Sequence, residues 1–159
     1  MDELLKLLEE NALSSPADLA QRLNRDPEEV ARHIKQLEDD RVILAYKAIV
    51  DDDKAGRDVV KAVIEVSLSP ERGGGFNRLA ARIAKYPAVK SAYLMSGRYD
   101  LMLLVEGKNL RDIASFVSEK LSTIQGVLST ATHFVLKPYK ELDTLMLEES
   151  EEERLKVSP

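Results

Sequence analysis

Two helix-start signals follow each other closely near the N-terminus of this chain. Ser15-Pro16-x-Asp18 and Asp26-Pro27-x-Glu29 each combine an N-cap residue, a proline at the first helical position and an acid at the third. After the second signal, Val30, Ile34 and Leu37 recur on one helical face. Only the short link from Leu23 to Arg25 separates the two segments, so the sequence predicts a helix-turn-helix.

Further elements are predicted on either side of this pair. Residues Asp2 to Glu10 form an amphipathic segment in which we expect Leu4, Leu5 and Leu8 to face inward. The run from Val42 to Val50 favours a following strand or wing. Residues 1–50 are therefore predicted to form a winged helix-turn-helix domain, an arrangement typical of proteins that bind double-stranded DNA.

The rest of the chain changes its period. Residues 51–58, rich in aspartate, break both hydrophobic patterns and are interpreted as a hinge. Over residues 59–140 we expect the following order of elements: a strand with Val60, Ala62, Ile64, Val66 and Leu68 on one face; a helix with Phe76, Leu79, Ala80 and Ile83; a hairpin of Val89 to Ser96 and Leu101 to Glu106; a helix burying Leu110, Ile113, Ala114, Val117, Leu121 and Ile124; and a strand from Val127 to about Lys137. The predicted fold class is α+β, with a ferredoxin-like βαββαβ domain after the winged helix-turn-helix.

A β-α-β-β-α-β order places both helices on one face of an antiparallel sheet. The segment from Leu101 to Val105 is nevertheless apolar on both sides, so the second face also needs a cover. The simplest cover is another copy of the same sheet, and we expect a homodimer or a higher oligomer. Residues 141–159 are predicted to be an acidic C-terminal tail, whose apolar start at Leu142 to Leu147 adds an edge strand or braces a neighbour.

Composition narrows the functional classes. At 159 residues, 44% hydrophobic and 32% charged, the chain has ordinary globular composition, and no apolar run reaches the roughly 18 residues of a membrane span. Met1-Asp2-Glu3 does not resemble a signal peptide, so we expect a cytoplasmic protein without membrane contact. The chain has no cysteine and two histidines, His33 and His133, so we expect no metal centre. The glycines 73–75 lack the phosphate-loop spacing, and neither a cofactor nor a catalytic constellation is predicted.

Charge is unevenly divided along the chain. Residues 1–50 carry seven Lys and Arg against eleven Asp and Glu, whereas residues 51–140 carry fourteen against ten. Residues 141–159 hold two basic and seven acidic side chains. Because DNA-binding domains normally have a basic surface, the acidic N-terminal part argues against tight binding by a single copy.

Together these segments resemble the Lrp/AsnC, or feast/famine, regulators, and the resemblance covers nearly the whole chain. It rests on Asp18-Leu19-Ala20, Val30-x-x-x-Ile34-x-x-Leu37-Glu38, Val42-Ile43, Gly97-Arg98-Tyr99-Asp100-Leu101, and Gly126-Val127 followed by Thr130-Ala131-Thr132. It implies a winged helix-turn-helix joined to an effector-binding RAM domain. It also implies dimers that assemble further, often into octamers, with amino acids bound between dimers.

The resemblance assigns candidate DNA contacts to the second helix and its surroundings. Arg32, Lys35 and Gln36 lie on its outward face together with Glu28, and they are the predicted base or phosphate contacts. His33 stands where relatives commonly carry arginine, and both a partly buried structural imidazole and a DNA contact are open interpretations. Arg22, Arg25 and Arg41 are candidate phosphate contacts, set against the ordinary role of exposed arginines at helix ends.

Candidate effector residues lie in the second domain. A turn with glycine and aspartate offers backbone N–H groups to an amino-acid carboxylate and an anion to its ammonium. The resemblance therefore implies effector contacts at Gly97, Tyr99 and Asp100. Thr130 and Thr132 are expected on one strand face, opposite His133, with both hydroxyls toward one cleft, and they are candidate effector contacts as well. From spacing alone, turn capping by Asp100 and ordinary strand propensity of the two threonines are the favoured interpretations.

Three functions compete at this stage. The leading hypothesis is a DNA-binding transcriptional regulator whose oligomer responds to an amino acid or related metabolite. The alternative is a metabolite-sensing assembly protein with weak or lost DNA binding, which the acidic first fifty residues favour. The third is a sirohaem decarboxylase of similar architecture, although its histidine and arginine features are not located in this sequence.

Overall fold

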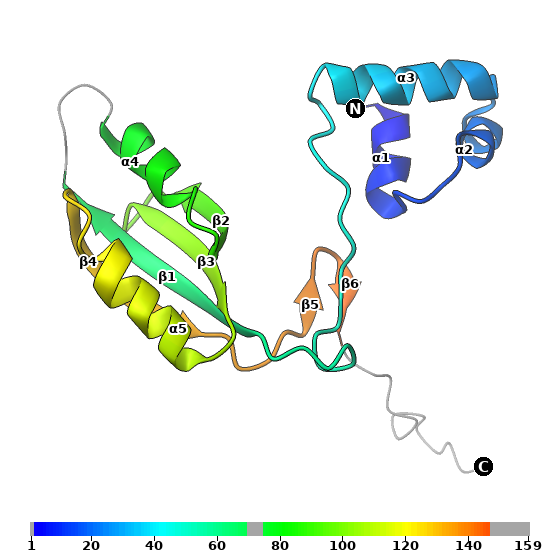
Figure 1. The fold of residues 1–159 in the computed structure, drawn as a ribbon. Helices are drawn as coiled ribbons and strands as arrows, with labels where there is room; N and C mark the ends of the chain where they lie inside the picture. Colours follow the sequence, from blue (N-terminus) through cyan, green and yellow to red (C-terminus); the bar gives the residue numbers. More distant parts are fainter. Residues whose placement is uncertain (1, 70–74, 147–159) are drawn as a thin grey trace, which may run out of the picture. The chain divides into compact units, whose positions relative to one another are not determined.

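The computed structural model describes residues 2–69 and 75–146. These residues form two compact units, and the division falls between Ala48 and Ile49 (Figure 1).

Three short helices form the N-terminal unit. They are α1 (Glu3–Glu10), α2 (Pro16–Leu23) and α3 (Pro27–Asp39). The Ser15 hydroxyl accepts a hydrogen bond from the Asp18 amide at 3.1 Å, which confirms the predicted start of α2. The Asp26 carboxylate accepts from the amides of Glu28 and Glu29 at 2.9 and 3.1 Å, and α3 begins as predicted. Between α2 and α3 the chain turns through Asn24, which adopts the left-handed conformation with φ 51°.

The core of this unit joins all three helices. Its buried side chains are Leu4, Leu7, Leu8, Leu19, Ala20 and Val30, with Leu23, Ile34, Leu37 and Ile43 packed against them. The expectation of an inward Leu5 was wrong, because Leu5 is only half-buried while Leu7 is buried. Leu4, Leu7 and Leu8 stand three and four residues apart and therefore share one helical face, from which Leu5 is rotated.

The segment from Val42 to Val50, predicted as a strand or wing, does not form a strand. Val42 and Ile43 donate their amide N–H groups to the carbonyl of Leu37 at 2.8 and 3.0 Å, so they close the end of α3. Residues 44–50 have no regular secondary structure. A strand needs a backbone partner, and the described part of the chain provides none for these residues. Their apolar pattern therefore remains largely exposed.

The second unit contains a four-stranded sheet with helices. Its elements are β1 (Val60–Leu68), α4 (Gly75–Ile83), β2 (Val89–Leu94), β3 (Leu101–Gly107), α5 (Leu110–Ser115), the π-helix η1 (Phe116–Leu121) and β4 (Val127–Phe134). The strand order is β2-β3-β1-β4, and every pair is antiparallel. The structure thus confirms the predicted βαββαβ order and the α+β fold class. Strand β4 ends at Phe134, earlier than the expected Lys137.

Only one face of this sheet is covered by helices. On β1 the side chains of Ala62, Ile64, Val66 and Leu68 are buried, and they share one cluster with Ile83 of α4 and Ile113 of α5. Figure 1 shows the same arrangement, with both helices on one side of the sheet. We call the other side the open face. It carries Lys61, Val63, Glu65, Met102 and Leu104, all half-buried.

The last helical segment, α5 and η1, buries a different set of side chains from the one predicted. Leu110 is 58% exposed and Ala114 is also exposed, so both were wrongly predicted to be buried. Phe116, which the helical period missed, is only 6% exposed and contacts the ring of Tyr86 edge-on at 5.5 Å. Leu110 and Ala114 belong to α5, whose buried side chain is Ile113. In η1 the buried side chains Phe116 and Leu121 are five residues apart, a spacing that the wider π-helical turn allows and a 3.6-residue period does not predict.

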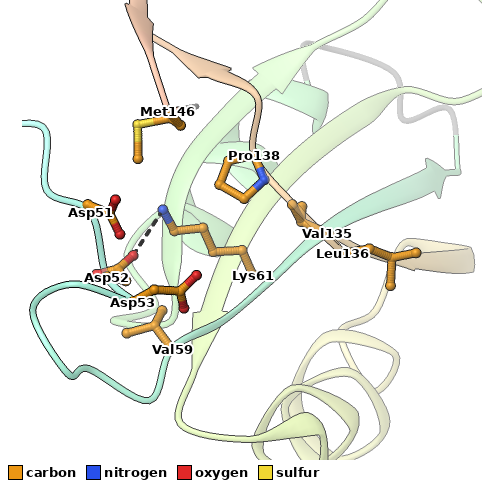
Figure 2. A pocket seen from close by; sticks show the side chains of 9 residues that line it. All are labelled: Asp51, Asp52, Asp53, Val59, Lys61, Val135, Leu136, Pro138 and Met146. Carbon is orange, nitrogen blue, oxygen red and sulfur yellow. Dashed lines mark ion pairs between the residues drawn. The ribbon is translucent and has the colours of Figure 1, made fainter. Parts of the chain in front are cut away.

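The aspartate-rich segment 51–58 is an ordered turn beside the sheet. Asp52 contacts both Arg57 and Lys61 at 3.3 Å, and Figure 2 shows Asp52 and Lys61 pointing toward one another in a pocket that Met146 and Pro138 also line. Lys61 also reaches Glu141 at 3.2 Å. Burial disfavours its ammonium form, but hydrogen bonds and attraction from these two carboxylates outweigh burial and raise the pKa of Lys61.

A small hairpin follows the four-stranded sheet at the end of the described residues. Strands β5 (Lys140–Glu141) and β6 (Thr144–Leu145) pair with each other and form a separate two-stranded sheet. The expectation of an added edge strand was therefore wrong for the four-stranded sheet. The predicted acidic tail lies, from residue 147 onward, outside the described residues.

The burial of Ile113 and the exposure of Leu110 predict different effects of substitution on stability. Ile113→Ala removes a buried side chain and should lower the free energy of unfolding by about 2–5 kcal/mol. Leu110→Ala removes an exposed one and should change it by less than about 0.5 kcal/mol. Urea denaturation followed by circular dichroism, at one protein concentration, measures both. Equal losses of unfolding free energy in the two variants would contradict the burial of Ile113 and the exposure of Leu110.

Candidate DNA-binding surface and effector site

Helix α3 presents a mixed-charge outer face. Because Val30, Ile34 and Leu37 point into the core, the opposite side of the helix is exposed. Its exposed side chains include Glu28, Arg32, Lys35 and Gln36. The Arg32 guanidinium donates back to the Glu28 carbonyl at 3.3 Å. This face thus carries one acceptor, two cationic donors and one amide that can do both, on the side of the helix that recognition helices commonly turn toward base edges.

Arg25 lies at the centre of a network beside this face. Its guanidinium contacts the Glu29 carboxylate at 2.6 Å and the Nδ1 atom of His33 at 3.4 Å. The other ring nitrogen of His33 lies 3.3 Å from Asp2, the N-cap residue of α1. His33 thus connects Asp2 with Arg25, and its side chain is only 29% exposed. Both facts fit the interpretation of a partly buried structural imidazole. A DNA contact by His33 stays a prediction.

The two other arginines proposed for phosphate contact differ in their surroundings. Arg22 lies 3.3 Å from Glu10 of α1, and both side chains are more than half exposed. Arg41 is exposed just beyond α3, where it adopts a left-handed φ of 56°. Arg22 and Arg25 therefore already have carboxylate partners within the N-terminal unit. Such exposed pairs can be exchanged for phosphate at small cost, because surface ion pairs contribute little stability.

A shallow hollow runs along this part of the surface. It is lined by Arg25, Glu29, Arg32, His33 and Gln36. The structure thus brings four of the predicted DNA contacts together, while Lys35 lies outside the lining. The sequence placed Glu29 in the first turn of this helix, where it would approach DNA, but not among the candidate contacts. Its ion pair with Arg25, which precedes the N-cap residue Asp26, is what brings it into the lining of the hollow.

The turn between β2 and β3 is fixed to the end of β1. Gly97 has φ 135°, a conformation that favours glycine. The Asp100 amide donates to the Val66 carbonyl at 3.0 Å, and its carboxylate accepts from the Leu68 amide at 2.7 Å. Asp100 therefore does have the turn-capping role. It is half-buried, so an added ligand would share this carboxylate with the Leu68 amide.

Thr130 and Thr132 lie on the neighbouring strand β4. They pair in register with Val66 and Ile64 of β1, and they point to the same face as those buried side chains. Strand β1 separates β3 from β4, so the Asp100 end of β3 and Thr130 are about 10 Å apart across two strand spacings. Thr130 thus shares the end of the sheet with the turn, whereas Thr132 lies one step further along.

The turn also reaches the open face. Arg98 contacts the Glu65 carboxylate at 3.0 Å, and His133 approaches the other oxygen of the same carboxylate at 3.4 Å. His133 therefore lies on the face opposite Thr130 and Thr132, as its position in the strand predicted. Tyr99, next to Arg98 in the sequence, is half-buried.

No helix within residues 2–69 and 75–146 is long and apolar enough to cross a membrane. In the same ranges, no group of three or more His, Asp and Glu side chains is arranged to hold a metal ion.

A capped helix-turn-helix followed by a βαββαβ domain with a glycine-aspartate turn defines a class of transcriptional regulators that carry a ligand-binding domain. Comparison with known families agrees with this class. Residues 3–43 match the winged helix-turn-helix DNA-binding family, and residues 61–145 match the Lrp/AsnC ligand binding domain. The chain belongs to the Lrp/AsnC family.

Individual relatives extend this finding over nearly the whole chain. The HTH-type transcriptional regulator YugG of Bacillus subtilis is 40% identical over 158 residues, covering 99% of this chain and 95% of the relative. The Bkd operon transcriptional regulator of Pseudomonas aeruginosa is 30% identical, covering 85% and 88%. Among solved structures, a transcriptional regulator from Neisseria meningitidis in complex with L-methionine is 27% identical, with a TM-score of 0.72 and coverage of 89% and 93%.

Proposed function

We propose that this protein is a transcriptional regulator whose oligomer binds double-stranded DNA through α3 and responds to an amino acid bound near the β2–β3 turn. Its place of action is the cytoplasm, and it needs neither a cofactor nor an enzymatic activity. The observation that carries the proposal is the pairing of two sites in one chain. One is the exposed face of α3 in a helix-turn-helix whose two helices are capped by Ser15 and Asp26. The other is the Gly97 to Asp100 turn.

The effector part rests on the chemistry of the turn. An amino acid needs an anion for its ammonium and N–H donors for its carboxylate, and Asp100 with the backbone around Gly97 offers both kinds of group. Tyr99 and Thr130 flank this end of the sheet, with Thr132 further along β4. The solved relative bound to L-methionine supports an amino acid as the class of ligand.

Assembly follows from the open face. Val63, Met102 and Leu104 are apolar side chains of a sheet whose helices all lie on the other side. We propose that a second copy covers this face, and that dimers associate further. Linked copies present several α3 helices to one duplex, so a weak single contact becomes useful through effective concentration.

A second function is favoured by the internal ion pairs of the N-terminal unit. Arg22 and Arg25 are paired with Glu10 and Glu29, which reduces the positive charge offered to phosphates. An assembly protein that senses a metabolite with weak or lost DNA binding would have this property. Effector binding without binding of any duplex at low salt would favour this second function.

The DNA-binding role predicts a specific loss. Arg32→Ala removes a guanidinium from the outer face of α3 and should raise the Kd for a selected duplex roughly tenfold, the usual effect of losing one good base or phosphate contact. Fluorescence anisotropy measures the Kd, and the solution mass should not change. Arg111→Ala, which removes the same charge from the exposed surface of α5, is the matched control. Equal effects of both variants would contradict a role for Arg32.

The effector role is tested at Asp100. Asp100→Asn keeps an oxygen that can accept from the Leu68 amide but removes the charge that an ammonium needs. The melting temperature without ligand should therefore stay close to that of the unchanged protein, while the stabilisation by a bound amino acid should be lost. A thermal-shift series with L-methionine and the other protein amino acids measures both. Asp143→Asn, in the exposed β5–β6 turn, serves as the control.

Stabilisation that survives in Asp100→Asn would remove Asp100 from the site. If no amino acid stabilises even the unchanged protein, the effector itself must be sought in another class of metabolite.

The open face predicts the solution mass. At micromolar concentration the unchanged protein should have the mass of two chains or a multiple of two. Leu104→Asp places a charge on the open face and should shift the mass toward one chain, whereas Leu110→Asp on the exposed surface of α5 should not. Light scattering after gel filtration gives the masses, and circular dichroism confirms that the variants fold. A single-chain mass for the unchanged protein would refute assembly through this face.

A further inference from the structure

Lys61 connects the aspartate-rich turn, residues 51–58, to the sheet. Three backbone hydrogen bonds of 2.9 to 3.1 Å close this turn within itself. One carboxylate oxygen of Asp52 contacts Arg57 inside the turn at 3.3 Å, and the other lies 3.3 Å from the ammonium of Lys61 on β1. A turn that bonds largely to itself is held against a sheet by an outward contact of this kind. The pair of Asp52 with Lys61 is thus an attachment point between the turn and β1.

The same ammonium also holds the C-terminal hairpin. Glu141 of β5 lies 3.2 Å from it, and the side chain of Lys61 is only 17% exposed. Burial disfavours the charged form, but the hydrogen bonds with Asp52 and Glu141 outweigh burial and raise the pKa of Lys61. An ammonium has three donors, so it serves both carboxylates at once. One side chain of β1 therefore joins the turn that precedes this strand with the hairpin near the end of the described chain.

A pocket of about 120 Å³ lies around this side chain. It is lined by Asp51 to Asp53 of the turn and by Pro138 and Met146 of the C-terminal segment, and Figure 2 shows Lys61 extending through it toward Asp52. Because protein interiors are otherwise close-packed, empty space of this size means that the residues of its walls do not pack closely against each other. The attachment of the turn depends correspondingly more on the ion pair.

This attachment limits how much free chain joins the two units. Residues 44–50 have no regular secondary structure, and a stretch of this length spans at most roughly 25 Å. If the turn left the sheet, residues 51–58 would be added to the connection, and its greatest reach would roughly double. A short connection restricts the positions that a tethered domain takes, whereas a longer one permits many more.

We propose that Lys61, by holding Asp52, limits the reach of each helix-turn-helix and thereby sets the spacing of DNA half-sites that the assembled protein accepts. The proposal rests on the proposed DNA-binding function and adds spacing specificity to it. Two recognition helices read half-sites that lie whole helical turns, roughly 10 base pairs each, apart on one side of the duplex. An added half-turn moves the second half-site to the opposite side, which a short connection does not reach. Lys61 is therefore a positioning residue, and it contacts no DNA in this role.

The competing role for this ion pair is local stability alone. In that case, removing the charge of Lys61 lowers the melting temperature but leaves the accepted spacing of half-sites unchanged. If the pair limits the connection, the same substitution makes differently spaced half-sites more nearly equal in affinity. The dependence of the Kd on spacing therefore separates the two roles.

The experiment uses the full-length protein and a half-site that the unchanged protein selects from a randomised duplex library. Two copies of this half-site are placed in one duplex, and their separation is varied one base pair at a time over a full helical turn. Fluorescence anisotropy gives the Kd for each duplex. The unchanged protein should bind a pair half a turn out of phase roughly tenfold more weakly than the best pair. Lys61→Met keeps an unbranched side chain without the charge and should reduce this difference to about threefold or less.

Hydrogen exchange without DNA tests the attachment itself. In Lys61→Met the amides that close the turn, those of Ala55, Gly56 and Arg57, should exchange roughly tenfold faster, because the turn is no longer held against β1. The amides of β3 that pair with β1 should keep their protection. Because Lys61 also lies on the open face, light scattering after gel filtration checks that the mass of the variant is unchanged.

Three further variants separate the attachment from charge and from folding. Asp52→Asn releases the turn without changing β1, so it should reproduce both effects, and it replaces Lys61→Met if that variant misfolds or changes its mass. Glu141→Gln removes the other carboxylate of Lys61 and leaves Asp52 in place, so the spacing preference should remain. Lys90→Met breaks a pair with Glu106 at 3.8 Å elsewhere on the sheet and should change neither the exchange of the turn nor the spacing preference.

The remaining outcomes overturn the inference. An unchanged spacing profile in Lys61→Met and Asp52→Asn, with a lower melting temperature, would assign the ion pair to local stability. Unchanged exchange of the turn amides would show that other contacts hold the turn, and an equal loss of preference in Lys90→Met would reduce the effect to general loss of charge. If the unchanged protein selects no half-site, the proposed DNA-binding function itself fails. If it selects one but accepts every spacing equally, only the inference fails.

Discussion

Strand β1 is the constraint on which the second unit depends. It pairs with β3 on one side and β4 on the other, and its alternate side chains are buried beneath α4 and α5. Because an antiparallel sheet with all helices on one side leaves its second face uncovered, the same strand also presents Val63 and Glu65 outward. Stability of the fold and the need for a partner surface thus arise from the two faces of one strand.

In the N-terminal unit, part of the positive charge is neutralised by acids of the same unit. Two of its four arginines are paired with acids of the same unit, Arg22 with Glu10 and Arg25 with Glu29. This pairing removes much of the long-range attraction that usually brings a duplex to a recognition helix. What remains is local: side chains whose positions are fixed by neighbours. A surface of this kind favours discrimination among base pairs over nonspecific affinity, because phosphate contacts supply affinity and base contacts supply sequence information.

The sequence predicted those parts of the fold that local chemistry determines. Ser15 and Asp26 cap their helices through their own side chains, and the alternation along β1 follows directly from strand geometry. The prediction was wrong where structure depends on distant or irregular geometry. Residues 44–50 have strand propensity but no described partner, and the π-helical turn η1 buries Phe116, which a regular helical period does not predict.

The candidate sites show the same division. The Gly97 to Asp100 turn was predictable from its residues, but the bond from the Leu68 amide to Asp100 joins residues 32 apart in the chain. The pairing of Arg25 with Glu29 was accessible through its four-residue spacing, whereas the approach of Asp2 to His33 required the three-helix packing. Long-range contacts of this kind decide whether a residue is structural, and sequence spacing does not contain them.

One carboxylate connects the turn with the open face. Glu65 lies on the open face, accepts Arg98 from the turn and approaches His133 on β4. Arg98 is 83% exposed and Glu65 only 19%, so the carboxylate is the more buried partner of this ion pair. A ligand at the turn influences assembly only if it binds the assembled and free forms with different affinity. The contact between Arg98 and Glu65 joins the proposed effector site to the face on which we propose assembly: without Arg98, Glu65 would be a less compensated acid on that face, and uncompensated charge disfavours burial.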